Sequence, residues 1–432
     1  MPRHSSRREF LKTATLTGLG VWVGGRAFGA ESPNERVRFA CIGVGGKGDS
    51  DTADAARLGD VVAICDVDES TLNKAASKYP MARKFSDYRK MLDEMEKSID
   101  AVTVSIPDHQ HAHAAAHAMQ IGKHCFVQKP LTHSIYEARR LGEIARDKKV
   151  ATQMGNQGTA SSGLRKSAAL VKAGVLGAVS EVHVWTDRPI WPQGIDRPPS
   201  TDVPSTLDWD LWLGPAPKRP YASGYHPFAW RGWWDFGNGA LGDMACHTAN
   251  LPYMALDLLN PTSVVAETSG TNHDSYPKWS IIHFEFPATG KRPAVKLTWY
   301  DGSKRPPAEL FEGKPPSGSG SLMVGEKGKL YSPGDYGSDR VLRGGAQETD
   351  VTFPESPGHF DEWVRAIKGG QPAMSNFADY SGPLTETILL GNLAVWADGK
   401  KIEWDAKSLK ATNAPEVSPI IRPEYRTGYS LG

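Results

Sequence analysis

Two short stretches of the chain carry polar residues whose types and spacing suit proton transfer. In WWDFGNGALGDMACHTANLPYMALDLL, Asp243 and His247 are four residues apart, so on a helix they share one face. A carboxylate can orient an imidazole or stabilise its charge, which makes the two residues a candidate acid–base pair. Lys129, in FVQKPLTHS, stands at the carboxyl end of a predicted strand, where ligands of open α/β sheets bind. Taken singly, Lys129 is more simply explained as a solvated lysine, Asp243 as a helix-starting aspartate and His247 as a hydrogen-bonded histidine. Only their occurrence together points to a site.

A glycine-rich loop precedes both stretches. FACIGVGGKGDS places Gly43, Gly45 and Gly48 in a G-x-G-x-x-G array that also contains Gly46, after an apolar strand and before a helix. In that setting the first glycine makes a tight turn, the second lets the backbone approach a pyrophosphate, and the third allows close helix packing. The helix N-terminus then faces the phosphate charge. Asp66 ends the next predicted strand, 23 residues after Gly43, which suits the acid that binds a ribose hydroxyl. Loop and acid together predict a dinucleotide site.

Acidic residues near Asp66 bear on which dinucleotide binds. Asp68 and Glu69 follow within three residues, and no arginine is close in the sequence. A 2′-phosphate would meet repulsion there, which favours NAD over NADP as the cofactor. A glycine-rich turn in an unrelated α/β protein is the alternative, and the joint occurrence of strand, loop and acid argues against it.

The elements that must position these residues change character along the chain. Between 37 and 153, short β-rich runs alternate with helical spacing, which predicts a parallel sheet covered by helices. After about residue 175 the β-like segments are longer, and 302–320 has the composition of a surface loop. The predicted helices lie at 51–58, 69–78, 86–96, 109–121, 134–148, 358–368 and 384–397, and the later strands at 179–187, 263–269, 278–286 and 293–301.

Composition narrows the class of protein. The 432 residues are 39% hydrophobic and 23% charged, as in soluble globular proteins, and exceed one ordinary core. The formal net charge of +1 argues against nucleic acid as a partner. No stretch reaches the roughly 18 consecutive apolar residues of an integral membrane span. Cys41, Cys65, Cys125 and Cys246 have neither disulfide-framework nor zinc spacing, and we expect them to be small core hydrophobes.

The N-terminus has the order of features of an export signal. Arg7 and Arg8 are followed by Phe-Leu-Lys, a mildly apolar run over 13–25, and small residues just before position 31. The pattern resembles a twin-arginine signal peptide over residues 1–30. It predicts the twin-arginine export machinery as a partner and a periplasmic or otherwise exported location. A basic disordered tail is the alternative.

Together these motifs resemble the Gfo/Idh/MocA oxidoreductases, the family of glucose–fructose oxidoreductase and inositol dehydrogenase. The resemblance runs from about Val37 to near the end of the chain. It rests on the glycine loop, PDHQHAHAAAHAMQIGKH, the Lys-Pro turn, GAVSEVHVW and the Asp-x-x-x-His helix. It implies that Lys129 lies beside the nicotinamide, and that Asp243 and His247 bind and deprotonate a substrate hydroxyl.

The residue before Lys129 departs from the family pattern, because Gln128 stands where the family usually has glutamate. Glutamine keeps the size and hydrogen-bonding capacity of glutamate but lacks its charge. We expect this loss to leave Lys129 easier to deprotonate.

The histidines of PDHQHAHAAAH invite a metal interpretation, since His113 and His117 are four apart on a predicted helix. No acidic or cysteine cluster accompanies them, so we expect no metal. The resemblance instead implies an Asp-His-x-His turn beside the cofactor, which makes Pro107 and His111 cofactor-binding candidates.

Seven tryptophans gather between 185 and 234, where aromatic rings could stack on a sugar or simply form the core of the second domain. Core packing explains most of them more simply. In YHPFAWRGWWDFG, just before the Asp243–His247 helix, Tyr225, His226 and Arg231 are the candidates for substrate contacts.

These observations predict an α/β protein with a signal over 1–30, an N-terminal Rossmann NAD-binding domain over 31–155, and a substrate and oligomerisation domain over 156–432. The resemblance implies that the second domain is α+β, with a large, mostly antiparallel open sheet that makes homo-oligomer contacts. The predicted function is NAD-dependent oxidation of a hydroxyl of a small carbohydrate, with the nucleotide held tightly as a prosthetic group. Two alternatives remain open: an NAD-dependent glycosidase, although the Thr-His-Gly-Leu-Gly segment of that subset is absent from the sequence, and a sugar-binding protein with a relic nucleotide fold.

Overall fold

The structure is a computed structural model that describes residues 36–432. The predicted signal over 1–30 lies outside the described residues. Residues 37–432 form one compact unit that contains two sheets. Among residues 36–432, no helix combines the length and the apolar composition that crossing a membrane requires.

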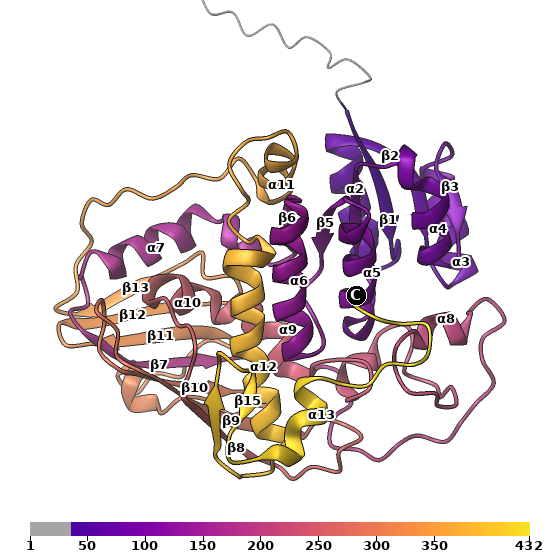
Figure 1. Ribbon diagram of the computed structural model, residues 1–432. Helices are drawn as coiled ribbons and strands as arrows, with labels where there is room; N and C mark the ends of the chain where they lie inside the picture. Colours follow the sequence, from indigo (N-terminus) through magenta and orange to yellow (C-terminus); the bar gives the residue numbers. More distant parts are fainter. Residues whose placement is uncertain (1–35) are drawn as a thin grey trace, which may run out of the picture. The chain divides into compact units, whose positions relative to one another are not determined.

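The first sheet is parallel throughout and has the strand order β3-β2-β1-β4-β5-β6 (Figure 1). Its strands are β1 (Val37–Ile42), β2 (Gly59–Cys65), β3 (Arg83–Phe85), β4 (Ala101–Val104), β5 (His124–Val127) and β6 (Thr152–Met154). The central runs VRFACI and AVTV are almost wholly buried, as expected where helices cover both faces of a parallel sheet. The carboxyl ends of β1, β4 and β5 lie side by side in this order.

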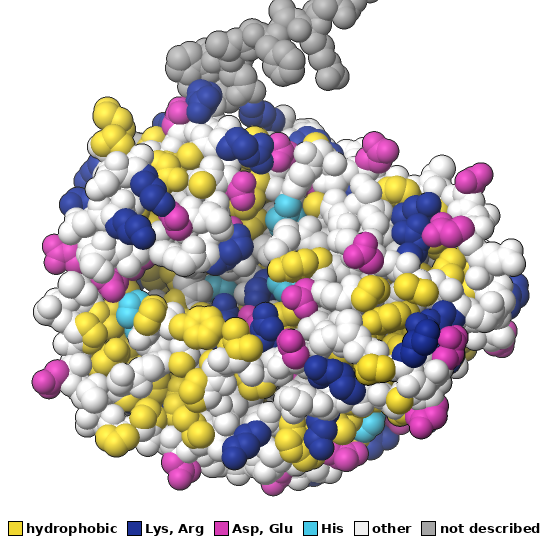
Figure 2. Space-filling model, turned by 180° about the vertical axis from the view of Figure 1, so that it is seen from behind, with side chains coloured by type: hydrophobic (Ala, Val, Ile, Leu, Met, Phe, Trp, Pro, Cys, Tyr) yellow, Lys and Arg dark blue, Asp and Glu magenta, His cyan; other side chains and the backbone are white. Residues whose placement is uncertain are grey.

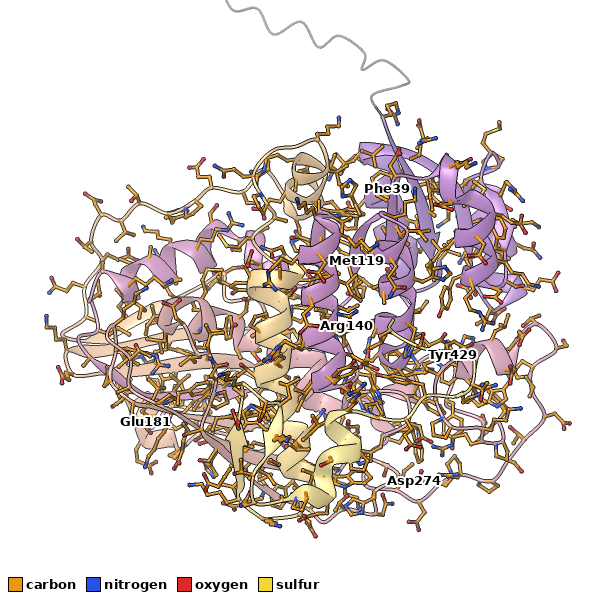
Figure 3. All side chains as sticks on the ribbon, in the orientation of Figure 1. Phe39, Met119, Arg140, Glu181, Asp274 and Tyr429 are labelled. Atoms are coloured by element: carbon orange, nitrogen blue, oxygen red, sulfur yellow. The ribbon has the colours of Figure 1, made fainter. Side chains whose placement is uncertain are left out.

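Five helices connect these strands, and three of them begin directly after an aspartate or serine whose side chain caps the helix N-terminus. They are α2 (Lys47–Leu58), α3 (Glu69–Lys78), α4 (Tyr88–Met95), α5 (Asp108–Gln120) and α6 (Ile135–Lys148). Ser134 and Glu137 form a capping box at the start of α6. Phe39 on β1 and Met119 on α5 are buried in the separate cores of the two sheet faces (Figure 3).

The second sheet has nine strands in the order β13-β12-β11-β7-β10-β9-β8-β14-β15. They are β7 (Val179–Trp185), β8 (Ser263–Thr268), β9 (Ser280–Phe286), β10 (Val295–Tyr300), β11 (Gly320–Gly325), β12 (Gly328–Pro333), β13 (Val341–Gly344), β14 (Ile402–Asp405) and β15 (Lys410–Ala411). Among the described strands, β7 and β10 form the one parallel pair of this sheet. Along β9, Ile282, Phe284 and Phe286 alternate with less buried residues, so one face packs on helices. The predicted fold class, a Rossmann domain followed by a domain with a mostly antiparallel sheet, is confirmed.

The remaining helices are α7 (Ser162–Lys172), α8 (Trp209–Leu213), α9 (Gly239–Thr248), α10 (Asn250–Leu256), α11 (His359–Ile367), α12 (Gly382–Trp396) and α13 (Ser418–Ile421). Late in the chain, α11 returns to the first sheet, where the Trp363 ring lies 5.6 Å from that of Phe39 and 5.7 Å from that of Phe126. Helix α12 packs along α6 and also covers β8 and β9 (Figure 1). The two sheets thereby share packing helices, a feature that the sequence pattern did not predict. All four cysteines are buried and free, which confirms their role as small core residues.

Candidate functional site

A cavity of about 610 Å³ lies between the carboxyl ends of the parallel strands and the segments around α9. Figure 2 shows one hollowed face of the molecule, on which His, Lys or Arg, and Asp or Glu side chains gather beside hydrophobic ones. The predicted site residues that line the cavity are Gly43, Gly45, Gly46, Asp66, Pro107, Lys129, His226, Arg231, Asp243 and His247. Residues from distant parts of the sequence are thus brought to one space.

The glycine loop has the geometry that its spacing predicts. Gly43 has φ +77°, and a Cβ there would lie 2.3 Å from the Ser105 carbonyl oxygen. A Cβ on Gly48 would lie 2.1 Å from the Gly43 carbonyl oxygen, so this third glycine lets α2 approach the strand rather than lining the cavity. Gly46 has φ +53°, precedes α2, and would direct a Cβ into open space. The space in front of Gly46 and the N-terminus of α2 therefore fits a pyrophosphate.

Asp66 fastens this loop and also faces the cavity. Its Oδ2 accepts a hydrogen bond from the Val44 backbone N–H at 3.0 Å, and its Oδ1 accepts one from the Asp68 N–H at 3.0 Å. Burial raises the pKa of Asp66, and the two backbone hydrogen bonds oppose this effect. Each carboxylate oxygen keeps a second lone pair, so the residue can accept hydrogen bonds from ribose hydroxyls.

His226 lies at the Asp66 end of the cavity, with its Nε2 3.2 Å from Asp68 Oδ2. Backbone hydrogen bonds join the same two regions, from Glu69 N–H to the Thr206 carbonyl oxygen at 2.8 Å and from Asp208 N–H to the Val67 carbonyl oxygen at 3.0 Å. The second domain therefore covers the loop after β2. His226 lines the cavity next to Asp68, and its contact with substrate stays a prediction.

Lys129 and Asp243 form a buried ion pair at the opposite end. Lys129 Nζ donates to Asp243 Oδ1 at 2.6 Å and to the Asp243 carbonyl oxygen at 2.9 Å. Arg231 Nε lies 3.4 Å from the same carboxylate oxygen. Burial raises the pKa of Asp243, but the charges of Lys129 and Arg231 outweigh it and lower the pKa to about 2. At neutral pH this end of the cavity holds a fixed negative charge between two cations.

His247 follows Asp243 by one helical turn on α9 and is neutral. Burial, reinforced by the charge of Lys129, lowers the pKa of His247 to about 3. Its Nδ1 is buried and has no hydrogen-bond partner among the described residues, and its ring meets the Tyr336 ring edge-on at 5.0 Å. The two residues share a helix face as predicted, but Asp243 accepts its hydrogen bonds from Lys129 and does not orient the imidazole. A neutral imidazole has one free lone pair, so it can accept a proton.

Three further residues at this end escaped sequence reasoning. Asp108, the first residue of α5, is buried, and burial raises its pKa to about 6 against the opposing charge of Arg231. Its Oδ1 is 3.4 Å from Arg231 Nη1, so Arg231 bridges two carboxylates. Arg188 Nε lies 3.9 Å from Asp243 Oδ2, and Tyr336 lines the cavity beside the imidazole. Asp108 follows the proline of PDHQH and could have been found there, whereas Arg188 and Tyr336 lie in loops without a recognisable pattern.

His111 lies behind the cavity wall. Its Nδ1 is 2.8 Å from the Pro130 carbonyl oxygen and its Nε2 is 2.7 Å from the Ile106 carbonyl oxygen. Burial lowers its pKa to about 4, so the neutral ring donates to one of these carbonyls at a time. Direct cofactor contact does not fit this position: the residue holds the turns on which Pro107 and Lys129 stand. Among residues 36–432, no group of three or more His, Cys, Asp or Glu side chains is placed to hold a metal ion.

The structure also corrects the prediction that Tyr225 contacts substrate, because it buries this side chain away from the cavity. Its hydroxyl hydrogen-bonds Arg219, and its ring packs on Trp233 and Phe236 at 5.2 and 5.3 Å. Six of the seven tryptophans between 185 and 234 are buried, which supports core packing as their main role. Trp212 and Trp230 contribute to the cavity wall as well.

Comparison with known proteins places this geometry in a family. A profile described as "Oxidoreductase family, NAD-binding Rossmann fold" matches residues 37–156, and one described as "Oxidoreductase family, C-terminal alpha/beta domain" matches residues 161–431. The WlbA dehydrogenase from Bordetella pertussis, solved in complex with NADH and UDP-GlcNAcA, superposes with a TM-score of 0.61 at 18% identity. The superposition covers 86% of this chain and 99% of the WlbA chain.

Curated relatives match shorter regions. A glycosyl hydrolase family 109 protein of Solibacter usitatus is 31% identical over 155 residues, which is 32% of this chain and 35% of that protein. Levoglucosan dehydrogenase of Pseudarthrobacter phenanthrenivorans is 22% identical over 205 residues, 48% of this chain and 45% of that protein. The chain thus spans less than half the length of either relative. Because the two family profiles together cover nearly all of residues 37–431, the chain belongs to the Gfo/Idh/MocA oxidoreductase family.

Proposed function

We propose that the protein is an NAD-dependent oxidoreductase that acts on a hydroxyl group of a sugar or sugar derivative. The observation that carries this proposal is the Lys129–Asp243 ion pair beside the neutral His247, at one end of a cavity whose other end holds the glycine loop and Asp66. A site that pairs acid–base groups with a dinucleotide cradle suits hydride transfer from an alcohol.

The chain's own residues fit NAD along the length of the cavity. The Gly46 turn and the N-terminus of α2 would hold the pyrophosphate, and Asp66 would accept from the ribose hydroxyls. Lys129, after β5, would lie beside the nicotinamide. A carboxylate at position 66 and a second at Asp68 disfavour the 2′-phosphate of NADP.

The polar groups at the Lys129 end of the cavity have different roles in the proton transfer. Bound NAD would supply the hydride acceptor. The free lone pair of neutral His247 accepts the proton of the substrate hydroxyl. Lys129 Nζ donates a hydrogen bond to the oxygen on which negative charge develops, and Asp243 keeps Lys129 aimed at that point. Arg231 lies beside the same Asp243 oxygen as Lys129 and helps to hold the carboxylate in place.

Two measurements test this assignment. Purified protein should release NAD on denaturation, as identified by mass spectrometry, and Lys129→Ala should keep the nucleotide while turnover falls roughly 10²- to 10⁴-fold. Protein that neither carries nor binds a nucleotide would favour a sugar-binding protein with a relic fold. Near-normal turnover in Lys129→Ala would show that Lys129 takes no part in the reaction.

A second candidate is an NAD-dependent glycosidase, which oxidises a sugar hydroxyl transiently, eliminates the aglycone and returns the hydride. The similarity to a glycosyl hydrolase family 109 protein favours it. Release of free aglycone from chromogenic glycosides would establish the glycosidase; oxidised sugar with the aglycone still attached would establish the dehydrogenase.

We further propose that the protein is exported by the twin-arginine route with its nucleotide already bound, and that it acts in the periplasm as a homo-oligomer. An exported enzyme meets little free dinucleotide, so the cofactor would be retained and re-oxidised in place. The hydrogen bonds that tie Glu69 to Thr206 and Asp208 to Val67 support retention, because they fasten the second domain over the ribose end. Periplasmic protein should contain near-stoichiometric NAD(H) after long dialysis; nucleotide that washes out would contradict retention.

A further inference from the structure

Asp51 is a buried carboxylate that the proposed reaction does not use. It lies on the second turn of α2, fully shielded from solvent. Its Oδ2 accepts hydrogen bonds from Ser105 Oγ at 2.7 Å and from Gln128 Nε2 at 2.8 Å. Because Ser105 follows β4 and Gln128 follows β5, one carboxylate joins α2 to the ends of two neighbouring strands.

The Gln128 side chain has little freedom to take another position. Its Nε2 donates to Asp51, and its Oε1 accepts from the Lys129 backbone N–H at 3.3 Å. Gly155 packs against the amide so closely that a Cβ there would lie 2.6 Å from Nε2. The side-chain amide must therefore present its N–H donor to Asp51. Its oxygen accepts from the backbone of Lys129, the residue whose side chain holds Asp243.

The other oxygen of Asp51 faces the glycine loop. Its Oδ1 pairs with Lys47 Nζ, which also lies 3.0 Å from Ser50 Oγ. Lys47 lies between Gly46 and Gly48 in the loop, lines the cavity, and has a side chain that is half exposed. Asp51 is therefore connected to the predicted phosphate end through Lys47 and to the Lys129 end through Gln128.

We propose that Asp51 is a positioning residue that couples the glycine loop to the Lys129 turn, and that it does so only with a hydrogen-bond donor at position 128. A carboxylate at 128 would face Asp51 Oδ2 at hydrogen-bond distance, so the two groups would either repel each other as buried negative charges or take up a proton to share, and both are costly at neutral pH. Exchange of the two groups, with the amide at 51 and the carboxylate at 128, restores one donor facing one acceptor. This inference rests on the proposed function in one respect: it takes NAD as the ligand that the cavity binds.

The exchange can be tested with Asp51→Asn, Gln128→Glu and the double variant, using NAD as the probe on the purified full-length protein after charcoal removal of nucleotide. Titration calorimetry should show that Gln128→Glu weakens NAD binding roughly tenfold or more, the effect of about 1.4 kcal/mol. The double variant should recover to within roughly threefold of the unmutated protein. Gln120→Glu is the matched control: it also replaces an amide donor, here to the Leu431 carbonyl oxygen, but far from the cavity, and should leave NAD affinity unchanged.

Two results would overturn the coupling. One is unchanged NAD affinity in Gln128→Glu, whether or not its unfolding temperature falls, because a purely structural Asp51 would alter stability alone. The other is a double variant that binds no better than Gln128→Glu. Failure of the proposed function is seen separately, as an unmutated protein that binds no NAD. The unfolding temperatures of the same variants then test the donor requirement at position 128, and a double variant no more stable than Gln128→Glu would overturn it.

Discussion

Removal of the charge on Lys129 perturbs the Asp243 pair directly. In Lys129→Met, Asp243 loses the ammonium group 2.6 Å from its Oδ1 but stays buried, with its side chain 10% exposed. Its pKa in the folded protein is about 2 against an ordinary 3.8, a difference of about two units or roughly 2 to 3 kcal/mol in favour of the ionised folded state. Arg231 remains 3.4 Å away and offsets part of the loss. We expect the free energy of unfolding at pH 7 to fall by about 2 kcal/mol or more.

The sign of the pH dependence follows from the same shift. A carboxyl whose folded-state pKa is lowered stabilises the fold above its unfolded-state pKa, near 4, and loses this contribution as pH falls toward 2. In the variant burial dominates, so the Asp243 pKa rises and the stability gap from the unmutated protein should narrow from pH 7 to pH 3. Urea unfolding at both pH values measures the gap.

Two matched variants make this result decisive. Lys78→Met removes an exposed pair, in which Lys78 and Asp49 are 46% and 45% exposed, and should cost less than about 1 kcal/mol. Adding Asp243→Asn to Lys129→Met should recover stability, because no unpaired charge then stays buried. Equal losses in the two lysine variants, or no recovery in the double variant, would refute the electrostatic account.

Three other predictions follow from the geometry. Asp66→Ala should weaken NAD binding roughly tenfold and lower the preference over NADP, as measured by titration calorimetry with both nucleotides; unchanged selectivity would show that Asp66 does not face the ribose. His247→Ala should lower turnover roughly 10²- to 10⁴-fold with nucleotide content unchanged, and the unmutated rate should show no His247 ionisation above about pH 5, because its pKa is about 3. Gly48→Ala should destabilise the fold by about 1–3 kcal/mol, because its Cβ meets the Gly43 carbonyl oxygen at 2.1 Å. Gly46→Ala should also destabilise the fold, because a side chain at φ +53° strains the backbone, and it should in addition weaken NAD binding, because its Cβ enters the space that fits the pyrophosphate; thermal unfolding and NAD titration measure the two effects.

Local pattern explains which parts of the fold were predictable. The runs that became β1, β2 and β4 are short, apolar and followed by helical spacing, and the glycine array lies at the end of the first. These signals are contained in a few tens of residues. The parallel pairing of β7 with β10 and the return of α11 to the first sheet depend on contacts between residues more than 100 positions apart, which no periodicity encodes.

The same distinction applies to the site. Lys129 stands in a motif directly after β5, Asp243 and His247 stand in a motif on α9, and the structure brings all three to one end of the cavity. Tyr225 and His226 were selected only because they precede α9 in the sequence. In the irregular segment before that helix the chain reverses direction repeatedly, so one residue is buried among aromatic rings and its neighbour reaches Asp68.

Transfer of hydrogen from a sugar carbon to bound nicotinamide is the central claim, and isotope labelling tests it most directly. Purified protein would be incubated with a panel of carbon-deuterated monosaccharides, uronic acids and methyl glycosides, and the released nucleotide analysed by mass spectrometry. We predict that at least one sugar places a single deuterium on NADH in the unmutated protein, whether or not the net reaction is redox-neutral, and that His247→Ala with the same bound nucleotide does so far more slowly. Bound NAD that acquires no deuterium from any member of the panel would contradict the account.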